Sequence, residues 1–461
     1  MTSSSVTAQR GFVVWFRDLR QWSVGSFVQT DWRWPSEVIK PLSTVLTRKV
    51  IDVKRDSRQI GQLRLVTLHF DGEMEQRDTG AGDSFKGRLF QADPGDVIYS
   101  KIDVRNGAIG IIPSGLGRVC VSSEYPVYTV NQNLAEARFI QLLFRTTAFR
   151  RKINSMISGA SGRKRVQPDD LEMVEVPLPS LAIQRKIVAA WEASRLAAAV
   201  TAAKIKQFER DIEARFLVDL GLKVPAEATL PKAFAVQWRD FLRWGVSYSQ
   251  LVKMGIDLSH SKYPLGTIGS IAAMIQYGTS EKANTANDGT PVIRMNNIVD
   301  GELDLWNLKH LRLSDTESSR LMLVDGDILF NRTNSKELVG KCAVFHADGQ
   351  YVFASYLIRV RVDTTLADPD FTAFALNSPI GRQQIDAMSR QIIGQANVNS
   401  EELRSLQVPL PLLNLQRRIA KRLAKRREQI AELKAEARSQ IEKSKSDIEA
   451  MILGTKSVNA A

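Results

Sequence analysis

The sequence has little of what a secreted, membrane or metal-dependent protein needs. It holds only two cysteines in 461 residues, Cys120 and Cys342, each within an apolar run. This usage indicates buried thiols in a reducing cytoplasm rather than a disulfide framework. The four histidines are scattered without the spacing of metal ligands, and no Cys-x-x-Cys pair occurs. No apolar run approaches the roughly 18 residues that span a membrane, and residues 1–8 lack the pattern of a secretory signal. We therefore expect a cytoplasmic protein with no metal site and no membrane contact.

Motifs that carry catalysis are also missing. The sequence has no Gly-x-x-x-x-Gly-Lys-Ser/Thr phosphate loop and no Gly-x-Gly-x-x-Gly after a strand. Residues 377–380, Asn-Ser-Pro-Ile, lack the second proline and the aromatic residue with which amino-methyltransferases hold a flipped base. The segment Glu432-Leu-Lys434 supplies one part of a metal-dependent nuclease motif, but no Pro-Asp pair stands beside it. The sequence thus predicts no catalytic residue and no cofactor in this chain.

Positive charge is what the chain has in excess. Lysine and arginine total 63 against 50 acidic residues, which gives a net charge of +13. A surplus of this size attracts polyanions, of which nucleic acid is the usual one. On charge alone, a basic enzyme without such a partner stays an alternative.

The sequence repeats itself once. Five segments of the first half return in the same order and at nearly constant spacing in the second half. They are residues 17–22 and 239–244 (RDLRQW and RDFLRW), 41–45 and 264–268 (PLSTV and PLGTI), 71–74 and 300–303 (DGEM and DGEL), 95–101 and 326–332 (GDVIYSK and GDILFNR), and 176–187 and 408–419 (VPLP, then QRKI or QRRI). Five ordered matches indicate a duplicated unit of about half the chain length.

Each half combines a mixed part with a long helix. Strand-like runs such as 61–68, 96–100, 120–122, 327–330 and 351–360 alternate with helical stretches at 135–144 and 371–388, which predicts an α/β globule with a curved mixed sheet. After each Pro-Leu-Pro, residues 181–220 and 412–453 hold no proline or glycine, and Gly221 and Gly454 follow as helix stops.

The apolar positions of these helices recur in steps of three and four. In the first helix they are Ile187, Trp191, Ser194, Ala198, Thr201, Ile205, Phe208, Ile212 and Phe216; in the second they are Leu415, Ile419, Leu423, Ile430, Leu433, Ala437, Ile441, Ile448 and Met451. Helices of this length can bury such seams on each other as an antiparallel coiled coil. We expect an α+β protein with α/β domains at 1–178 and 223–410, related by a pseudo-twofold axis, and long helices at 179–222 and 411–461.

Several of these segments resemble the specificity subunits of type I restriction–modification systems. The resemblance is carried by the Val-Pro-Leu-Pro junctions with their Gln-Arg-Lys-Ile or Gln-Arg-Arg-Ile, by residues 275–282 (IQYGTSEK) and 289–298 (GTPVIRMNNI), and by the two Gly-Asp segments. It implies two target-recognition domains, each reading one half of a split site on double-stranded DNA, with the long helices as spacer. The implied partners are two modification subunits, which are adenine methyltransferases, and restriction subunits; S-adenosylmethionine, ATP and Mg²⁺ would be bound by those partners. In the first half, Val45–Val50 stands where the second half has Tyr277-Gly-Thr-Ser.

Loops in both halves carry basic and amide side chains suited to phosphates and base edges. The candidate DNA-binding residues are Lys101, Arg105, Asn106, Arg163, Lys164 and Arg165 in the first half, and Tyr277, Thr279, Ser280, Lys282, Arg294, Asn296, Asn331, Arg332, Asn334, Lys336, Gln395 and Asn397 in the second. Each loop alone could be a solvated turn. The alternatives to a DNA reader are a single-chain nuclease or methyltransferase with unrecognised motifs, and a non-catalytic coiled-coil scaffold.

Overall fold

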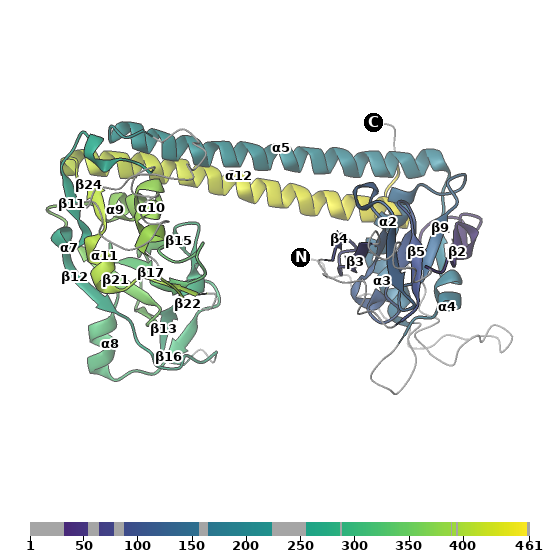
Figure 1. The fold of residues 1–461 in the computed structure, drawn as a ribbon, viewed down its shortest axis with the longest axis horizontal. Coiled ribbons are helices and arrows are strands. Elements are labelled where there is room, and N and C mark those ends of the chain that lie inside the picture. Colours follow the sequence, from purple (N-terminus) through teal and green to yellow (C-terminus); the bar gives the residue numbers. More distant parts are fainter. Residues whose placement is uncertain are drawn as a thin grey trace, which may run out of the picture. The chain divides into compact units, whose positions relative to one another are not determined.

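The computed structural model describes residues 32–53, 64–77, 87–155, 165–223, 255–285, 288–388, 390–392 and 395–458. The chain forms two compact units: Met1–Thr201 with Glu436–Ala461, and Ala202–Ala435. Two long helices, α5 (Leu181–Asp219) and α12 (Leu413–Leu453), each contribute one part to both units (Figure 1). Among the described residues no helix is long and apolar enough to cross a membrane.

The described part of the first unit's α/β domain is built from short strands and short helices. Its strands are β1 (Ile39–Pro41), β2 (Leu46–Lys49), β3 (Arg64–Leu68), β4 (Met74–Gln76), β5 (Leu89–Ala92), β6 (Val97–Tyr99), β7 (Ile109–Ile111), β8 (Val119–Ser122), β9 (Val127–Val130) and β10 (Glu175–Pro177), and its helices are α2 (Ala137–Arg145), α3 (Thr147–Ser155) and α4 (Pro168–Glu172). They form four-stranded sheets β2-β9-β6-β7 and β4-β3-β8-β5 and the pair β1-β10.

The second unit repeats this plan. Its strands are β11 (Leu265–Thr267), β12 (Ala272–Tyr277), β13 (Thr290–Ile293), β14 (Ile298–Val299), β15 (Glu302–Leu303), β16 (Lys309–Leu311), β17 (Ile328–Asn331), β18 (Thr333–Asn334), β19 (Cys342–Val344), β20 (Val352–Phe353), β21 (Leu357–Val362), β22 (Arg390–Ile392), β23 (Gln395–Asn397) and β24 (Gln407–Pro409). Its helices are α7 (Ile268–Ile271), α8 (Asp315–Leu321), α9 (Pro369–Asn377), α10 (Pro379–Met388) and α11 (Ser400–Ser405).

Corresponding sheets show that the two units share one topology. The antiparallel sheet β2-β9-β6-β7 of the first unit corresponds to β12-β21-β17-β19 of the second. Likewise β3 pairs with β4 antiparallel and with β8 parallel, and β13 pairs with β16 antiparallel and with β20 parallel. The tandem repeat predicted from sequence is therefore confirmed.

One of the sequence matches was out of register. Ile39 pairs with Pro177 in the first unit, and Leu265 pairs with Pro409 in the second. Pro41 therefore corresponds to Thr267, not to Pro264 as the match between 41–45 and 264–268 had it.

The place of Tyr277 in the repeat follows from the neighbouring strands. Lys49 pairs with Val127 in the first unit, and Gln276 pairs with Arg359 at the corresponding position of the second. Val50 therefore stands at the position of Tyr277. It is the last residue of Val45–Val50, the segment that the sequence comparison matched to Tyr277-Gly-Thr-Ser.

The long helices begin and end where the sequence predicts. Each starts just after Pro-Leu-Pro, and Gly221 and Gly454 follow with φ of 78° and 79°, the left-handed conformation that ends helices. All the predicted seam positions are buried or half-buried, and most residues between them are exposed. Within each unit the two helices run antiparallel (Figure 1); in the second, Asp219 of α5 meets Arg422, and Glu209 meets Lys434 at 3.1 Å.

Three other predictions of local structure were too simple. Residues 351–360 form not one strand but parts of β20 and β21, because the chain turns at 354–356 and enters a second sheet. Residues 371–388 form two helices, because Ser378 is extended before Pro379. Each domain also holds several small sheets in place of one curved sheet.

Candidate nucleic-acid interface

In the second unit, a short turn joins three of the predicted loops. This turn, residues 354–356 between β20 and β21, is tied to each loop by one backbone hydrogen bond. The amide of Ala354 donates to the carbonyl of Ile293 at 2.9 Å, and that of Ser355 to Thr279 at 2.7 Å. The backbone amide of Arg332 donates in turn to the carbonyl of Tyr356 at 3.0 Å. The loops at 277–282, 294–296 and 331–336 therefore converge on one place.

Arg332 occupies the middle of this place. Its guanidinium carbon lies 4.8 Å from the centre of the Tyr277 ring, a cation–π contact. The hydroxyl of Tyr277 accepts a hydrogen bond from the amide of Ser400 at 2.9 Å, which fixes the ring. Arg332 Nη2 makes a long 3.5 Å hydrogen bond to Asn397, and its buried Nε has no partner in the described structure. Within the described residues no carboxylate forms an ion pair with Arg332, so it presents a positioned cation with spare donors.

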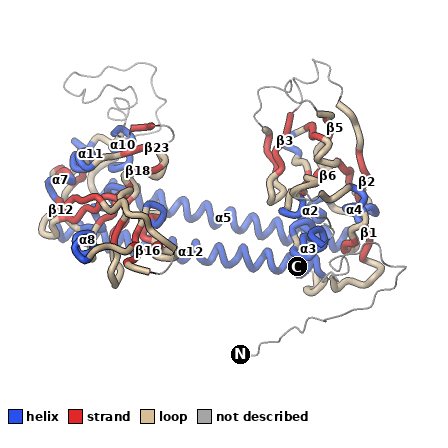
Figure 2. The backbone as a smooth tube through the Cα atoms, turned by 90° about the horizontal axis from the view of Figure 1, so that it is seen from below, coloured by secondary structure: helices blue, strands red, loops and turns tan. Residues whose placement is uncertain are grey.

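A fourth predicted loop joins the same surface. Strands β18 and β23 lie side by side in Figure 2 and pair with each other. Thr333 stands opposite Asn397, and Asn334 opposite Ala396. The amide of Val398 also donates to the carbonyl of Arg332 at 2.9 Å. We name this surface the Arg332 face; it comprises residues 277–282, 294–296, 331–336, 354–356 and 395–397.

The other predicted residues of this unit differ in exposure. Ser280, Lys282, Asn296, Lys336 and Gln395 are exposed, and Thr279, Arg294, Asn334 and Asn397 are half-buried. Asn331 differs from the prediction, because only 2% of it is exposed and its backbone pairs with residues 340 and 341. Its side chain is therefore buried in this structure and is not presented on the surface. Sequence reasoning missed Tyr356, which is 52% exposed, because a strand-like run concealed the turn that presents it.

The first unit brings its own predicted loops together in the same way. The amide of Val166 donates to the carbonyl of Lys101 at 2.9 Å, which matches the bond from Val398 to Arg332. Lys101 therefore stands at the position of Arg332. Arg165 pairs with Glu124 at 3.2 Å. Arg105 is half-buried, and Asn106 is exposed but bonds to Asp103. Arg163 and Lys164 lie outside the described residues.

The Gly-Asp segments hold the strands that carry Lys101 and Arg332. Asp96 and Asp327 each accept a hydrogen bond from the amide three residues earlier, at 2.7 and 3.0 Å. Asp327 is fully buried and pairs with Arg361 at 2.7 Å, and Asp96 pairs with Lys49 at 2.6 Å. These carboxylates are structural, because their hydrogen bonds and ion pairs hold them beneath the surface.

The described residues hold no cluster of candidate metal ligands. Among them, no group of three or more histidine, cysteine or acidic side chains could hold a metal ion. Cys120 and Cys342 are buried and free, as predicted, and burial raises the pKa of both thiols, that of Cys342 to about 12. What the geometry provides is an arginine in the second unit that Tyr277 and Asn397 position, and a lysine at the corresponding place of the first unit.

Comparison with known proteins identifies the family. The model of the type I restriction modification DNA specificity domain matches residues 86–209 and 261–443. The chain belongs to this family. Each match covers part of one α/β domain and continues along the long helix that follows it, and the two together include all the candidate residues. The resemblance seen in the sequence is confirmed.

Individual relatives agree with this assignment. The chain is 25% identical over 295 residues to the specificity subunit of the type I restriction enzyme EcoKI of Escherichia coli K12, which is 63% of this chain and 59% of that protein. It is 22% identical over 287 residues to the StySPI specificity subunit of Salmonella potsdam, 62% and 57% of the two chains. The chain thus spans less than two thirds of these relatives. A solved structure of a type I R-M system contains a chain with the same fold, with a TM-score of 0.54 and 18% sequence identity. The match covers 90% of this chain and 96% of that one.

Proposed function

We propose that this specificity-domain protein reads a bipartite site on double-stranded DNA and directs partner subunits to it. Each α/β domain would read one half-site, through Lys101 and its neighbours in the first unit and through the Arg332 face in the second. The observation that carries the proposal is the convergence of separate basic and amide loops around the positioned cation Arg332, with the same backbone bonds at Lys101 in the first unit. Such a set supplies the guanidinium and amide donors that read base edges.

The chemistry would belong to the partners. We propose that two modification subunits, adenine methyltransferases, bind S-adenosylmethionine and that restriction subunits supply ATP- and Mg²⁺-dependent cleavage, all in the cytoplasm. This chain would be non-catalytic. Two arrangements of the same fold in one chain favour two copies of one partner.

The test is to reconstitute the chain with its modification subunit and sequence the methylated positions. Arg332→Ala should weaken binding to one half-site about 5- to 150-fold, the loss expected if a bidentate base contact of about 1–3 kcal/mol disappears. Arg332→Lys keeps the charge but not the planar fork, so it should still bind yet discriminate poorly. Lys223→Ala, an exposed cation outside all the loops, is the control.

Different outcomes would favour the alternatives. Methylation or cleavage by the isolated chain would make it an enzyme. If the affinity of the chain for DNA does not fall steeply as the salt concentration rises, the chain would be a scaffold rather than a DNA reader. Equal loss at both half-sites would assign Arg332 to general phosphate binding.

A further inference from the structure

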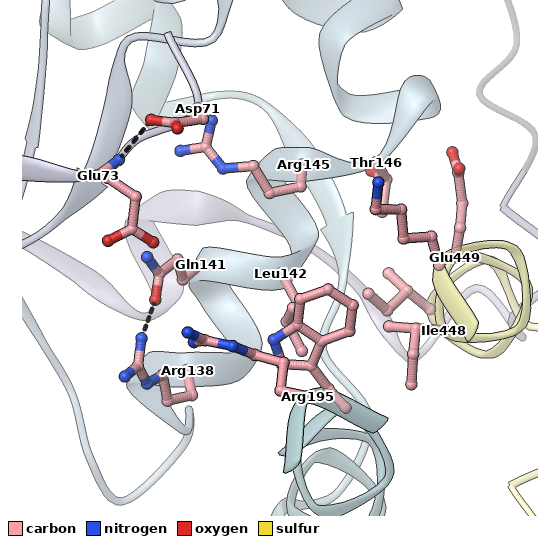
Figure 3. A pocket seen from close by; sticks show the side chains of 13 residues that line it. Asp71, Glu73, Arg138, Gln141, Leu142, Arg145, Thr146, Arg195, Ile448 and Glu449 are labelled. Atoms are coloured by element: carbon pink, nitrogen blue, oxygen red, sulfur yellow. Dashed lines mark hydrogen bonds between the residues drawn. The ribbon is translucent and has the colours of Figure 1, made fainter. Parts of the chain in front are cut away.

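Each unit contains a hollow where its α/β domain meets the long helices. In the first unit a cavity of about 510 Å³ is lined by the turn between β3 and β4, the end of α2, and parts of α5 and α12. Figure 3 shows Glu73, Leu142, Arg195 and Ile448 around this space. In the second unit a cavity of about 380 Å³ lies among the turn between β14 and β15, the end of α9, and parts of α5 and α12. We call these two cavities the junction hollows.

The junction hollows are copies of one another. Six lining positions correspond through the repeat: Asp71 and Asp300, Glu73 and Glu302, Leu142 and Phe374, Arg145 and Asn377, Thr146 and Ser378, and Arg195 and Arg427. The same glycine supports both turns: Gly72 and Gly301 have φ of 78° and 81°, and a Cβ at either would contact the side chain of Arg145 or Asn377 respectively. Arg145 in turn reaches the carbonyl of Ile109, and Asn377 that of the corresponding Cys342.

The residue types that line the two hollows match between the units, whereas those of the candidate DNA-binding loops differ. An acidic pair, a hydroxyl and an arginine stand at the same lining positions in both units. By contrast, Lys101 stands where Arg332 does, and Val50 where Tyr277 does. Surfaces that read different half-sites should differ, whereas surfaces that bind two copies of one molecule should match.

The lining suits a polypeptide with both an apolar and a charged side chain. Acidic and basic side chains line each hollow together, so its charge is mixed. Glu73 and Glu302 are exposed, and in the described structure neither carboxylate forms an ion pair or a hydrogen bond, so each is open to a basic residue of a bound segment. Apolar side chains line the same spaces, among them Leu142 and Ile448 in the first unit and Phe374 and Ile430 in the second. A segment with an apolar side chain beside a lysine or arginine complements both features.

We propose that each junction hollow docks the same short segment of a modification subunit, one with an apolar side chain next to a basic residue. This rests on the proposed function, in which two modification subunits bind one chain. The arginine at position 195 or 427 would face an acidic or carbonyl group of the same segment.

The experiment reverses one matched charge in each hollow of the full chain. Glu73→Lys and Glu302→Lys, separately and together, are mixed with the modification subunit and the complexes are weighed by native mass spectrometry. Each single variant should bind one modification subunit at wild-type affinity and the second at least tenfold more weakly, and the double variant should lose both. Glu192→Lys and Asp348→Lys, exposed acids outside the hollows, are the controls and should bind two.

DNA binding by each variant alone separates this proposal from the proposed function. Unchanged DNA affinity with lost stoichiometry supports the hollows as docking sites. Two modification subunits on the double variant, or loss of both on a single variant, would overturn the proposal and leave the DNA-reading function intact. Failure of the wild-type chain to bind any modification subunit would overturn the proposed function itself.

Discussion

In each unit, one buried glutamine joins the α/β domain to the long helix that follows it. Gln184 and Gln416 are completely buried, and each sits in the first turn of its helix. The Gln416 side chain accepts from the amide of Asp368 at 2.9 Å and donates to the carbonyls of Leu366 and Pro411 at 3.1 and 2.8 Å. Gln184 makes the same three bonds in the first unit. The glutamine of the repeated Gln-Arg-Lys-Ile and Gln-Arg-Arg-Ile motif is therefore a structural clamp.

We expect Gln416→Ala to lower the free energy of unfolding of the second unit by on the order of 3 kcal/mol, because three buried backbone groups lose their partner. Chemical denaturation followed by circular dichroism measures the loss. Gln429→Ala removes an exposed glutamine from the same helix and should change stability by less than about 0.5 kcal/mol. Equal effects of the two variants would contradict the clamp.

His346 gives the second unit a dependence on pH. Its ring bonds to Asp325 at 2.7 Å and to Asp370 at 3.1 Å. Burial lowers the pKa of His346, but the bonds to the two carboxylates raise it by more, and the net shift is upward. Because the folded pKa exceeds the unfolded value of about 6.5, this contribution to stability is complete below about pH 6.5 and is lost as pH rises through the folded pKa. NMR titration of the His346 ring in the unaltered chain measures its folded pKa. His346→Gln should remove the pH dependence of stability, which thermal unfolding of both proteins at several pH values would detect. An unshifted titration would refute it.

At the scale of elements, local signals were sufficient for the long helices. Pro-Leu-Pro before each helix and a glycine after it fixed both ends, since these residues act on neighbouring backbone alone. The seam positions followed from their spacing. By contrast, the turn at 354–356 depends on β20 and β21 joining different sheets, a long-range pairing that a run of β-branched and aromatic residues does not reveal.

The same reasoning explains what could be predicted of the site. Loops rich in basic and amide residues were evident, but their convergence depends on the pairing of β18 with β23, two strands that are distant in the sequence. The burial of Asn331 beside the half-buried Arg332 was equally hidden, because the turn at Gly340, which closes on Asn331, decides which side chain points inward. Sequence could name candidates; only tertiary pairing decides which of them share a surface.

At the scale of the whole molecule, the first unit is completed by the other end of the chain. Ile448 and Ile452 lie in the same buried cluster as Phe144 and Ile187. The carbonyls of Ile452 and Leu453 accept bonds from the Trp34 ring and the Arg33 amide at 2.8 and 2.7 Å. The amide of Thr147 also donates to Glu449.

Ending the chain at residue 435 should therefore damage the first unit and spare the second. Without Ile448 and Ile452, the apolar side of α5 near Ile187 and Trp191 is exposed to water, at a cost of roughly 25 cal/mol for each Å². Hydrogen exchange resolved by peptide should show fast exchange in α2 and α3 and unchanged protection in α9 and α10. Uniform loss across both units would contradict the division.

Because of this arrangement, the unit whose synthesis begins first is the one whose folding can be completed last. Residues 202–435 form a contiguous unit that can close as soon as it leaves the ribosome, whereas the unit whose sequence emerges first must wait for residues 436–458. At about 5–20 residues per second, translating the stretch 202–435 takes roughly 12 to 47 s. Throughout that interval the nascent first unit carries an open apolar groove on α5, which makes it the part of the newborn chain most in need of a chaperone.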